Sequence, residues 1–232
     1  MSITILFEQA GFLAADKPEG IPSIPERDLA LPSLVRMLEE ERGKKLYVVH
    51  RLDKEASGVM LFAKDAAAHK WLNDLFAERR IRKTYLLLAH GIISGESGRI
   101  DKPLRQFGSG RMGVDATKGR ESVTEFRVRE RFSRHTLIEA HPLTGRRHQL
   151  RVHFYSIGHP LAGDLRYGDR SLQQGYPRLL LHAWRIEIPL ASGGHFTVES
   201  PIPDSFTSAI TGARNDAGGS TPDGEERGNS PP

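Results

Sequence analysis

One carboxylate in the sequence stands where it could do chemistry. Asp53 lies between a short apolar stretch, Tyr47–Val49, and the continuous apolar run Val59–Ala63, so we expect it in a loop between two strands. Arg51 is two residues away, and Gly58 permits a tight turn. A carboxylate held beside a cation can serve as a nucleophile or a base, but an acid in such a loop is more often a simple turn residue.

The charge distribution favours a polyanionic partner. The chain of 232 residues carries a net charge of +4, although residues 212–232 hold two arginines against four acids, which leaves +6 for the rest. Clusters of cations suit a nucleic acid, because neutralising phosphates releases counterions, and they also suit an ordinary solvated surface. The clusters are Arg79, Arg80, Arg82 and Lys83; Arg127, Arg129, Arg131 and Arg134; and Arg146, Arg147 and Arg151.

A glycine-rich segment matches the sequence pattern of a nucleotide-binding loop. Residues 108–113 read G-x-G-x-x-G, the pattern of a dinucleotide-binding loop. Such a loop needs a strand before it and a helix after it. Residues 103–107 make a poor strand and residues 114–120 lack an apolar helical face. We therefore predict a flexible loop here, and no cofactor.

The histidines invite a metal site that their spacing does not support. His148 and His153 are five residues apart and would lie on different sides of a helix, unlike the ligand pair of a zinc protease. The chain has no cysteine, and no acid stands between Glu139 and Asp164 to complete a ligand set. We expect no metal, and interpret these histidines as structural, capping or RNA-facing residues.

The composition is that of a soluble globular protein, with 38% hydrophobic and 27% charged residues. No run of about 18 apolar residues is present, and the first residues lack the basic-then-apolar order of a secretory signal. The absence of cysteine excludes disulfides. We therefore expect a cytoplasmic protein that does not enter a membrane.

Short strands dominate the pattern and do not alternate regularly with helices. We predict helices over residues 32–42, 65–80 and 146–157, from apolar residues at helical spacing and from flanking caps and glycines. This order argues against a doubly wound parallel sheet and for an α+β domain with a mixed, mainly antiparallel sheet flanked by helices. The predicted strands are 3–7, 12–15, 47–49, 59–63, 84–89, 123–128, 136–140, 179–181, 185–188 and 195–199, the last two joined as a hairpin through residues 192–194.

The chain divides into one folded domain and a tail. Residues 212–232 contain no aliphatic side chain larger than alanine and are rich in Gly, Ser, Pro and acids. Such a segment cannot offset its ordering entropy by burial. We predict one folded domain over residues 1–211 and a disordered tail over residues 212–232.

Six blocks of the sequence, in order, resemble the RluA-type family of RNA pseudouridine synthases. The block around Asp53, H-R-L-D-K-E-A-S-G-V-M-L-F-A-K, resembles the family signature H-R-L-D-x-x-T-S-G-L-L-L-F-A-K. With the segment D-K-P-E-G at residues 16–20, the resemblance spans residues 12–203. The other blocks are K-T-Y-L-L-L-A-H-G at 83–91, Lys118 with residues 122–126, L-T-G-R-R-H-Q-L-R-V-H at 143–153, I-G-H-P-L-A-G-D at 157–164 with Tyr167 and Gly168, and R-L-L-L-H-A at 178–183.

The resemblance implies a reaction and the residues that perform it. A pseudouridine synthase breaks the bond between ribose and uracil nitrogen, turns the base and rejoins it through carbon. Asp53 would be the nucleophile or base, Arg151 would pair with it, and Tyr85 would stack on the base and assist proton removal. The target uridine would have to flip out of its stack into a cleft across the sheet. Candidate RNA contacts are His50, Arg51, Lys83, Arg146 and Arg147, with Leu180 or Leu181 lining the uracil pocket.

Two positions depart from the family pattern: Ala56 stands in place of threonine, and Arg147 in place of a small Thr or Ser. Both bear on substrate preference more than on activity. With a strand from Ile3 there is no room for the family's small N-terminal RNA-binding module, so target selection would fall to the catalytic domain, which we expect to be a monomer. The substrate would be ribosomal or transfer RNA.

Two other classes compete with this interpretation. An RNA-binding module without catalysis would share the basic clusters but would not need Asp53 and Arg151 together. A uridine-specific glycosidase or nuclease would need a second carboxylate or a metal, and no second acid stands in a comparable motif.

Overall fold

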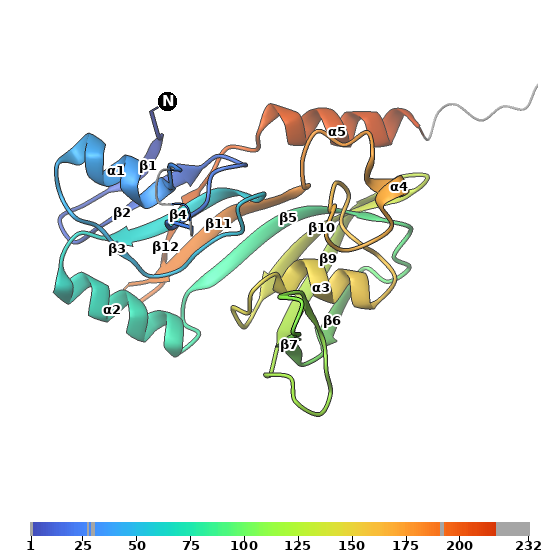
Figure 1. Cartoon of the computed structure of the whole chain (residues 1–232), viewed down its shortest axis with the longest axis horizontal. Coiled ribbons are helices and arrows are strands. Elements are labelled where there is room, and N and C mark those ends of the chain that lie inside the picture. The colour runs from blue at the N-terminus through green and yellow to red at the C-terminus, as the bar shows by residue number, and fades with distance from the viewer. Residues whose placement is uncertain (1, 27, 29–30, 191–192, 217–232) are drawn as a thin grey trace, which may run out of the picture.

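The computed structural model describes residues 2–26, 28, 31–190 and 193–216. Within them a bent sheet runs through the whole molecule, with helices on both of its faces (Figure 1). The helices are α1 (Leu34–Arg42), α2 (Ala66–Ala77), α3 (Gln149–Ser156), α4 (Arg170–Gln173) and α5 (Asp204–Asn215). The strands of the sheet are β1 (Ile5–Glu8), β2 (Phe12–Lys17), β3 (Tyr47–Val48), β4 (Ser57–Ala63), β5 (Arg82–His90), β6 (Ser97–Asp101), β9 (Val123–Arg131), β10 (His135–Pro142), β11 (Leu181–Pro189) and β12 (His195–Glu199).

The strand order is β1-β2-β4-β11-β5-β10-β9-β6, with β3 beside β4 and β12 beside β11. Every pairing is antiparallel except that of β4 with β11, which is parallel. The predicted α+β class with a mixed, mainly antiparallel sheet is confirmed. The parallel pair joins two segments that are 125 residues apart, since Ser57 lies opposite His182.

Alternation along the strands assigns each helix to a face of the sheet. In β2, Phe12 and Ala14 pack towards α2, whereas Leu13 and Ala15 pack towards α1. In β5, alternate residues likewise pack towards α3 and towards α5. Helices α1 and α5 therefore cover one face, and α2 and α3 cover the other (Figure 1).

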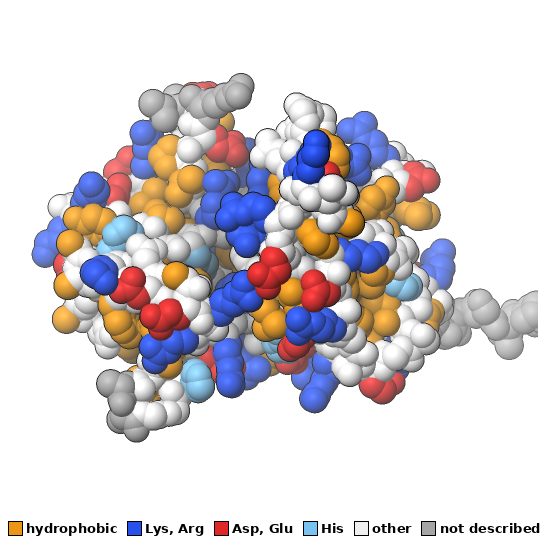
Figure 2. All heavy atoms as spheres, turned by 90° about the horizontal axis from the view of Figure 1, so that it is seen from below, with side chains coloured by type: hydrophobic (Ala, Val, Ile, Leu, Met, Phe, Trp, Pro, Cys, Tyr) orange, Lys and Arg blue, Asp and Glu red, His pale blue; other side chains and the backbone are white. Residues whose placement is uncertain are grey.

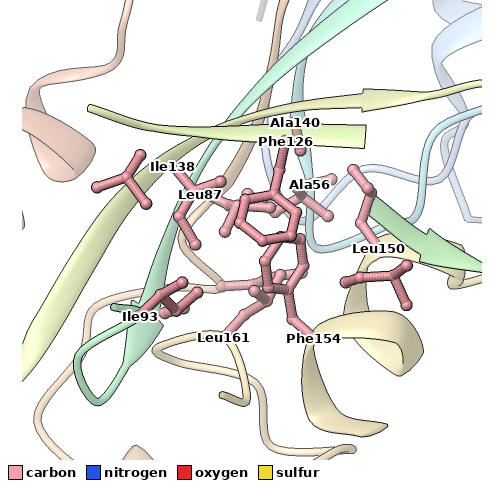
Figure 3. Packing of buried hydrophobic residues seen from close by; sticks show 14 residues of the cluster. Ala56, Leu87, Ile93, Phe126, Ile138, Ala140, Leu150, Phe154 and Leu161 are labelled. Atoms are coloured by element: carbon pink, nitrogen blue, oxygen red, sulfur yellow. The ribbon is translucent and has the colours of Figure 1, made fainter. Parts of the chain in front are cut away.

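The core beneath α3 also holds the loop that carries Asp53. Phe126 of β9 meets Phe154 of α3 edge to face, with ring centroids 5.4 Å apart. Ala56, three residues after Asp53, packs into the same cluster beside Leu87 and Leu150 (Figure 3). The loop thus enters the protein interior directly after the carboxylate.

Most predicted elements differ from the structure by up to three residues at an end, β6, α4 and α5 were not predicted, and three elements differ further. Helix α3 begins at Gln149 and not at residue 146, because His148 adopts a left-handed conformation with φ of 52°. The segment predicted as a flexible loop at residues 108–113 holds the turn and the start of the second strand of a hairpin, β7 (Leu104–Gln106) and β8 (Met112–Val114). Strand β11 is continuous from residue 181 to 189, where two shorter strands were expected.

The predicted boundary of the tail is also wrong. Helix α5 continues through Asn215, and within residues 212–216 Ala213 is buried in the cluster formed with Phe206. Arg214 donates two hydrogen bonds to Glu130, at 2.9 and 2.6 Å. The first turns of α5 have enough apolar surface to pack against the sheet. Because an existing helix is easily extended, residues of low apolar content continue it as far as Asn215. Residues 217–232 of the predicted tail lie outside the described residues.

Candidate active site

A cavity of about 470 Å³ opens on the face between α2 and α3. Lys83 and Tyr85 of β5 and Leu181 of β11 contribute to it from the sheet. The segments 49–53 and 142–151 contribute from the two halves of the molecule. Figure 2 shows the hollow from this side, with Lys and Arg side chains gathered around it.

The loop of Asp53 is held mainly through its backbone. The fully buried Lys17 of β2 donates from Nζ to the carbonyl oxygens of Pro18, Lys54 and Ala56, at 2.8, 3.1 and 2.6 Å. Just beyond the loop, Gly58 has φ of 117° and lies so close to Ala183 that a Cβ atom would collide with its carbonyl oxygen. Only glycine allows this approach of the parallel strands.

Arg151 lies at the centre of the site, with only 2% of its side chain exposed. Its Nε and Nη2 atoms each donate to the carboxylate of Asp164, at 2.8 Å. Its remaining Nη1 lies 3.3 Å from both Asp53 Oδ2 and Glu55 Oε2. Arg151 does pair with Asp53, but its two-point partner is Asp164. Burial alone would lower the pKa of Arg151, yet the hydrogen bonds and charge of Asp164, with Asp53 and Glu55, raise it overall.

The Asp53 carboxylate is largely enclosed, with 19% of its side chain exposed. Burial raises its pKa above the ordinary 3.8, opposed by the hydrogen bond and charge of Arg151 and by the charge of Arg51. Without Arg151 the carboxylate would have to lose its charge or leave the pocket. Arg151 therefore favours the charged form of Asp53 in a partly dry cavity.

Tyr85 faces the cavity from the middle of the sheet. Its cross-strand neighbours are Ala140 on β10 and Ala183 on β11, whose small side chains leave space beside the ring. Burial, and then the charge of Asp53, raise the pKa of Tyr85. The phenol therefore keeps its proton, which suits stacking and hydrogen-bond donation and does not favour a role as a base.

The predicted RNA contacts fall into two groups. Arg51, Lys83 and Arg146 line the cavity, and burial lowers the pKa of Lys83 to about 8. Arg147 is exposed beside the cavity and does not line it. His50 lines it, but its Nε2 accepts the backbone N–H of Leu61 at 2.8 Å, so one side of the ring fixes the loop to β4.

Of the two leucines proposed for the uracil pocket, Leu181 lines the cavity. Leu180 points to the opposite face, where it packs with Phe206 of α5. The alternation of side chains along an extended segment sends neighbouring residues to opposite faces, so only one of the pair could reach the site.

Two site residues, Asp164 and Tyr167, were given no role from the sequence, and His148 was interpreted only as a structural, capping or RNA-facing residue. Asp164 holds Arg151 and is completely buried. Tyr167 is also buried and lies under Arg151, whose guanidinium is 5.3 Å from the ring centroid. His148 places Nδ1 2.8 Å from Tyr167 Oη and Nε2 3.9 Å from Asp53 Oδ1. Asp164 and Tyr167 fall in a block that resembles the family, so the sequence marked their positions but did not indicate what they do.

The arrangement brings a carboxyl group paired with a buried arginine, a protonated phenol and several basic side chains to one cavity. Among the described residues, no three His, Asp or Glu side chains gather in a way that could hold a metal ion. The helices of this part of the chain are also too short or too polar for any of them to cross a bilayer.

Comparison with known proteins identifies the family. The model of the RNA pseudouridylate synthase family matches residues 11–156. A ribosomal large subunit pseudouridine synthase C from Yersinia pestis is 36% identical, over 92% of this chain and 70% of its own length. An uncharacterized RNA pseudouridine synthase from Zymomonas mobilis is 33% identical, over 88% of this chain and 95% of its own.

A solved structure agrees with the sequence relatives. Human RNA pseudouridylate synthase domain containing 1 superposes with a TM-score of 0.74 at 30% identity, over 87% of this chain and 84% of its own. This protein therefore belongs to the RluA-type family of RNA pseudouridine synthases.

Proposed function

We propose that this enzyme converts specific uridines of large-subunit ribosomal RNA to pseudouridine, with Asp53 as the nucleophile or base. The observation that carries the proposal is the pairing of Asp53 with the buried Arg151 inside a cavity with basic side chains at its margin. The names of several relatives, ribosomal large subunit pseudouridine synthases C and D, favour ribosomal RNA over transfer RNA.

The reaction needs a uridine inside the cavity. An enclosed carboxylate cannot reach a base within a helix, so the nucleotide has to leave its stack. Arg51, Lys83 and Arg146 line the cavity and would neutralise the phosphates that flank it. Arg147 adds positive charge outside the cavity, where it would contact the RNA further along.

Inside the cavity, the ionised Asp53 acts on the sugar or the uracil ring to release the base. The ring of Tyr85 supports the base while it turns, and Leu181 supplies an apolar wall. Burial raises the pKa of Tyr85, so the resting phenol is protonated and donates a hydrogen bond to the base. When C5 of the base bonds to the ribose, the Asp53 carboxylate takes the proton that leaves C5. Tyr85→Phe keeps the stacking surface and should slow the chemistry while RNA affinity stays normal.

No step of this scheme transfers an electron or a phosphoryl group. We expect the enzyme to work in the cytoplasm, as a monomer, without a metal or another cofactor. Activity should therefore survive chelators and need no added nucleotide.

The decisive experiment removes one charge from either side of Arg151. Asp53→Asn and Glu55→Gln each delete a carboxylate that lies 3.3 Å from the same Nη1 atom. Asp53→Asn should abolish turnover while RNA binding persists, because an amide is neither a nucleophile nor a base. Glu55→Gln is the matched control and should keep substantial activity. The readout is release of tritium from C5 of uridine in transcribed ribosomal RNA.

Mapping pseudouridine in total RNA from cells with and without the gene tests the substrate. Loss of a large-subunit ribosomal site in the deletion strain, restored by wild type and not by Asp53→Asn, supports the proposal. Loss confined to transfer RNA would overturn the ribosomal assignment and leave the chemistry intact. Substantial turnover by Asp53→Asn would overturn the assignment of Asp53.

A further inference from the structure

The backbone marks His148 as an unusual residue. In the described part of the chain two residues other than glycine have a left-handed backbone, Arg79 with φ of 57° and His148 with φ of 52°. Both line the active-site cavity. A side chain with a Cβ atom is unfavourable in this conformation, and such strain persists where the surrounding structure enforces it, as it does at functional sites.

The contacts of His148 define which ring nitrogen carries the proton. Tyr167 Oη accepts the backbone N–H of Met112 at 3.2 Å, so its own proton is available for His148 Nδ1 at 2.8 Å. Burial lowers the pKa of His148 to about 3, helped by the charges of Arg151, Arg147 and Arg166 and opposed by Glu55. A neutral ring that accepts at Nδ1 carries its hydrogen on Nε2.

Asp53 is incompletely fixed by Arg151. Two guanidinium nitrogens are committed to Asp164, and the third divides its N–H groups between Asp53 and Glu55 at 3.3 Å. A single long contact to Oδ2 leaves the Asp53 carboxylate free to rotate about its Cβ–Cγ bond. The other oxygen, Oδ1, lies 3.9 Å from His148 Nε2. A movement of less than about 1 Å would turn this approach into a hydrogen bond, and catalytic hydrogen bonds often tighten only in the substrate complex.

We propose that His148 is a positioning residue, whose Nε2–H donates to Asp53 Oδ1 in the RNA complex and fixes the plane of the carboxylate. Tyr167 orients the ring, and the left-handed backbone of His148 aims it. The inference rests on the proposed role of Asp53 and adds a second point of attachment for that side chain.

Substituting glutamine or asparagine for His148 tests the roles of the two ring nitrogens separately. Glutamine can place an amide N–H near the position of Nε2, and so reach Asp53, but it has no acceptor at the position of Nδ1 for Tyr167. Asparagine can keep an acceptor near Nδ1 for Tyr167 but is too short to reach Asp53. Asparagine is also among the residues that best tolerate a left-handed backbone, so His148→Asn should be the more stable variant of the two.

The expected order of activity is therefore opposite to the order of stability. In single-turnover assays with saturating enzyme and transcribed, tritium-labelled ribosomal RNA, His148→Asn and His148→Ala should react about 10- to 100-fold more slowly than wild type. His148→Gln should be the fastest of the three. RNA affinity should stay within about twofold for all three, because a neutral imidazole neutralises no phosphate.

A matched control lies at the other end of α3. His159 is also partly buried, with Nδ1 2.9 Å from the carbonyl oxygen of His90, and it does not line the cavity. His159→Gln should react at the wild-type rate. Melting temperatures of all variants separate lost folding from lost positioning.

Three outcomes would overturn the inference. The first is a wild-type rate in His148→Ala. The second is an activity order that follows melting temperature, with His148→Asn ahead of His148→Gln. The third is a loss of RNA affinity with an unchanged single-turnover rate. Asp53→Asn distinguishes failure of this inference from failure of the proposed function. If Asp53→Asn is inactive while His148→Ala has the wild-type rate, the proposed function stands and only the role of His148 is wrong.

Discussion

Two buried arginines, Arg151 and Arg178, bond to the two ends of the segment from Asp53 to Ser57 and differ in their other partners. Arg151 contacts three carboxylates, and one of them, Asp53, opens to the cavity. Arg178 contacts one carboxylate, Glu19, together with Ser57 Oγ and the carbonyl oxygen of Leu179. The surplus of negative charge raises the pKa of Arg151 overall, whereas burial lowers that of Arg178.

The comparison separates a site from a scaffold. Around Arg151 three carboxylates meet one guanidinium, and one of them, Asp53, lines the cavity. Around Arg178 the remaining donors and acceptors are satisfied locally, since Ser57 Oγ also bonds to His182 Nδ1 at 2.9 Å. An unbalanced buried charge requires a compensating function, whereas a balanced one gives rigidity.

The largest effect is expected from Arg151→Ala. Removing this side chain leaves Asp164 unpaired with none of its surface exposed, so the free energy of unfolding should fall by about 3–5 kcal/mol. Turnover should fall below detection, because Asp53 loses its counter-charge. Chemical denaturation and the tritium assay measure the two losses. A variant that kept wild-type stability would show that Asp164 is solvated, contrary to the comparison.

Arg178→Met should affect stability more than chemistry. Its partner Glu19 is 39% exposed and can be solvated, and Ser57 keeps His182, so the loss should be about 1–3 kcal/mol. Turnover measured well below the melting temperature should fall much less than in Arg151→Ala. Equal loss of activity in the two variants would show that turnover depends on Arg178 as much as on Arg151.

The pH dependence of turnover should depend on the acid beside Arg151 and not on the acid near Arg178. Burial raises the pKa of Asp53, which pairs with Arg151, and of Asp16, on which the charge of Arg178 acts. Turnover requires ionised Asp53, so kcat/KM should fall with acid at a pH above the ordinary value of 3.8, and Asp16→Asn should leave this limb in place. Because the folded pKa is the higher one, protonated Asp53 stabilises the fold at low pH and this contribution is lost as pH rises through the folded pKa. At neutral pH Asp53→Asn should therefore be at least as stable as wild type.

The smallest effects are expected at the C-terminal end, far from both arginines. Deleting residues 212–232 removes the buried Ala213 and the Arg214–Glu130 pair, and should lower the melting temperature by a few degrees. Deleting residues 217–232 should change it less, because that segment has no aliphatic side chain larger than alanine. Neither deletion should alter kcat. Equal melting temperatures for the two truncations would show that the end of α5 adds no stability.

Sequence reasoning reached the fold class because side-chain alternation is local. The strand order was beyond it: the parallel pairing of β4 with β11 depends on contacts between residues 57–58 and 182–183, and no local pattern records them. The start of α3 was missed for a related reason. A left-handed histidine carries no signal of its own, and the Gln149 side chain accepts from the Arg146 backbone N–H at 3.0 Å, ahead of the helix.

At the site, the resemblance placed Asp53, Tyr85 and Arg151 together, and they do line one cavity. It could not show that Arg151 is held at two points by Asp164, or that His148 faces Asp53, because both facts depend on side-chain geometry. The choice between Leu180 and Leu181 depended on which face each side chain takes, and only the packed sheet decides that.

The attachment of the Asp53 loop to Lys17 has a consequence for how this enzyme can diversify. Lys17 holds Lys54 and Ala56 through carbonyl oxygens, a group that every amino acid possesses. The exposed side chains at positions 54 and 55 can therefore be exchanged while the anchor stays the same. Residues beside Asp53 can therefore change without loss of the loop's shape, so a change in RNA preference would carry little risk to folding.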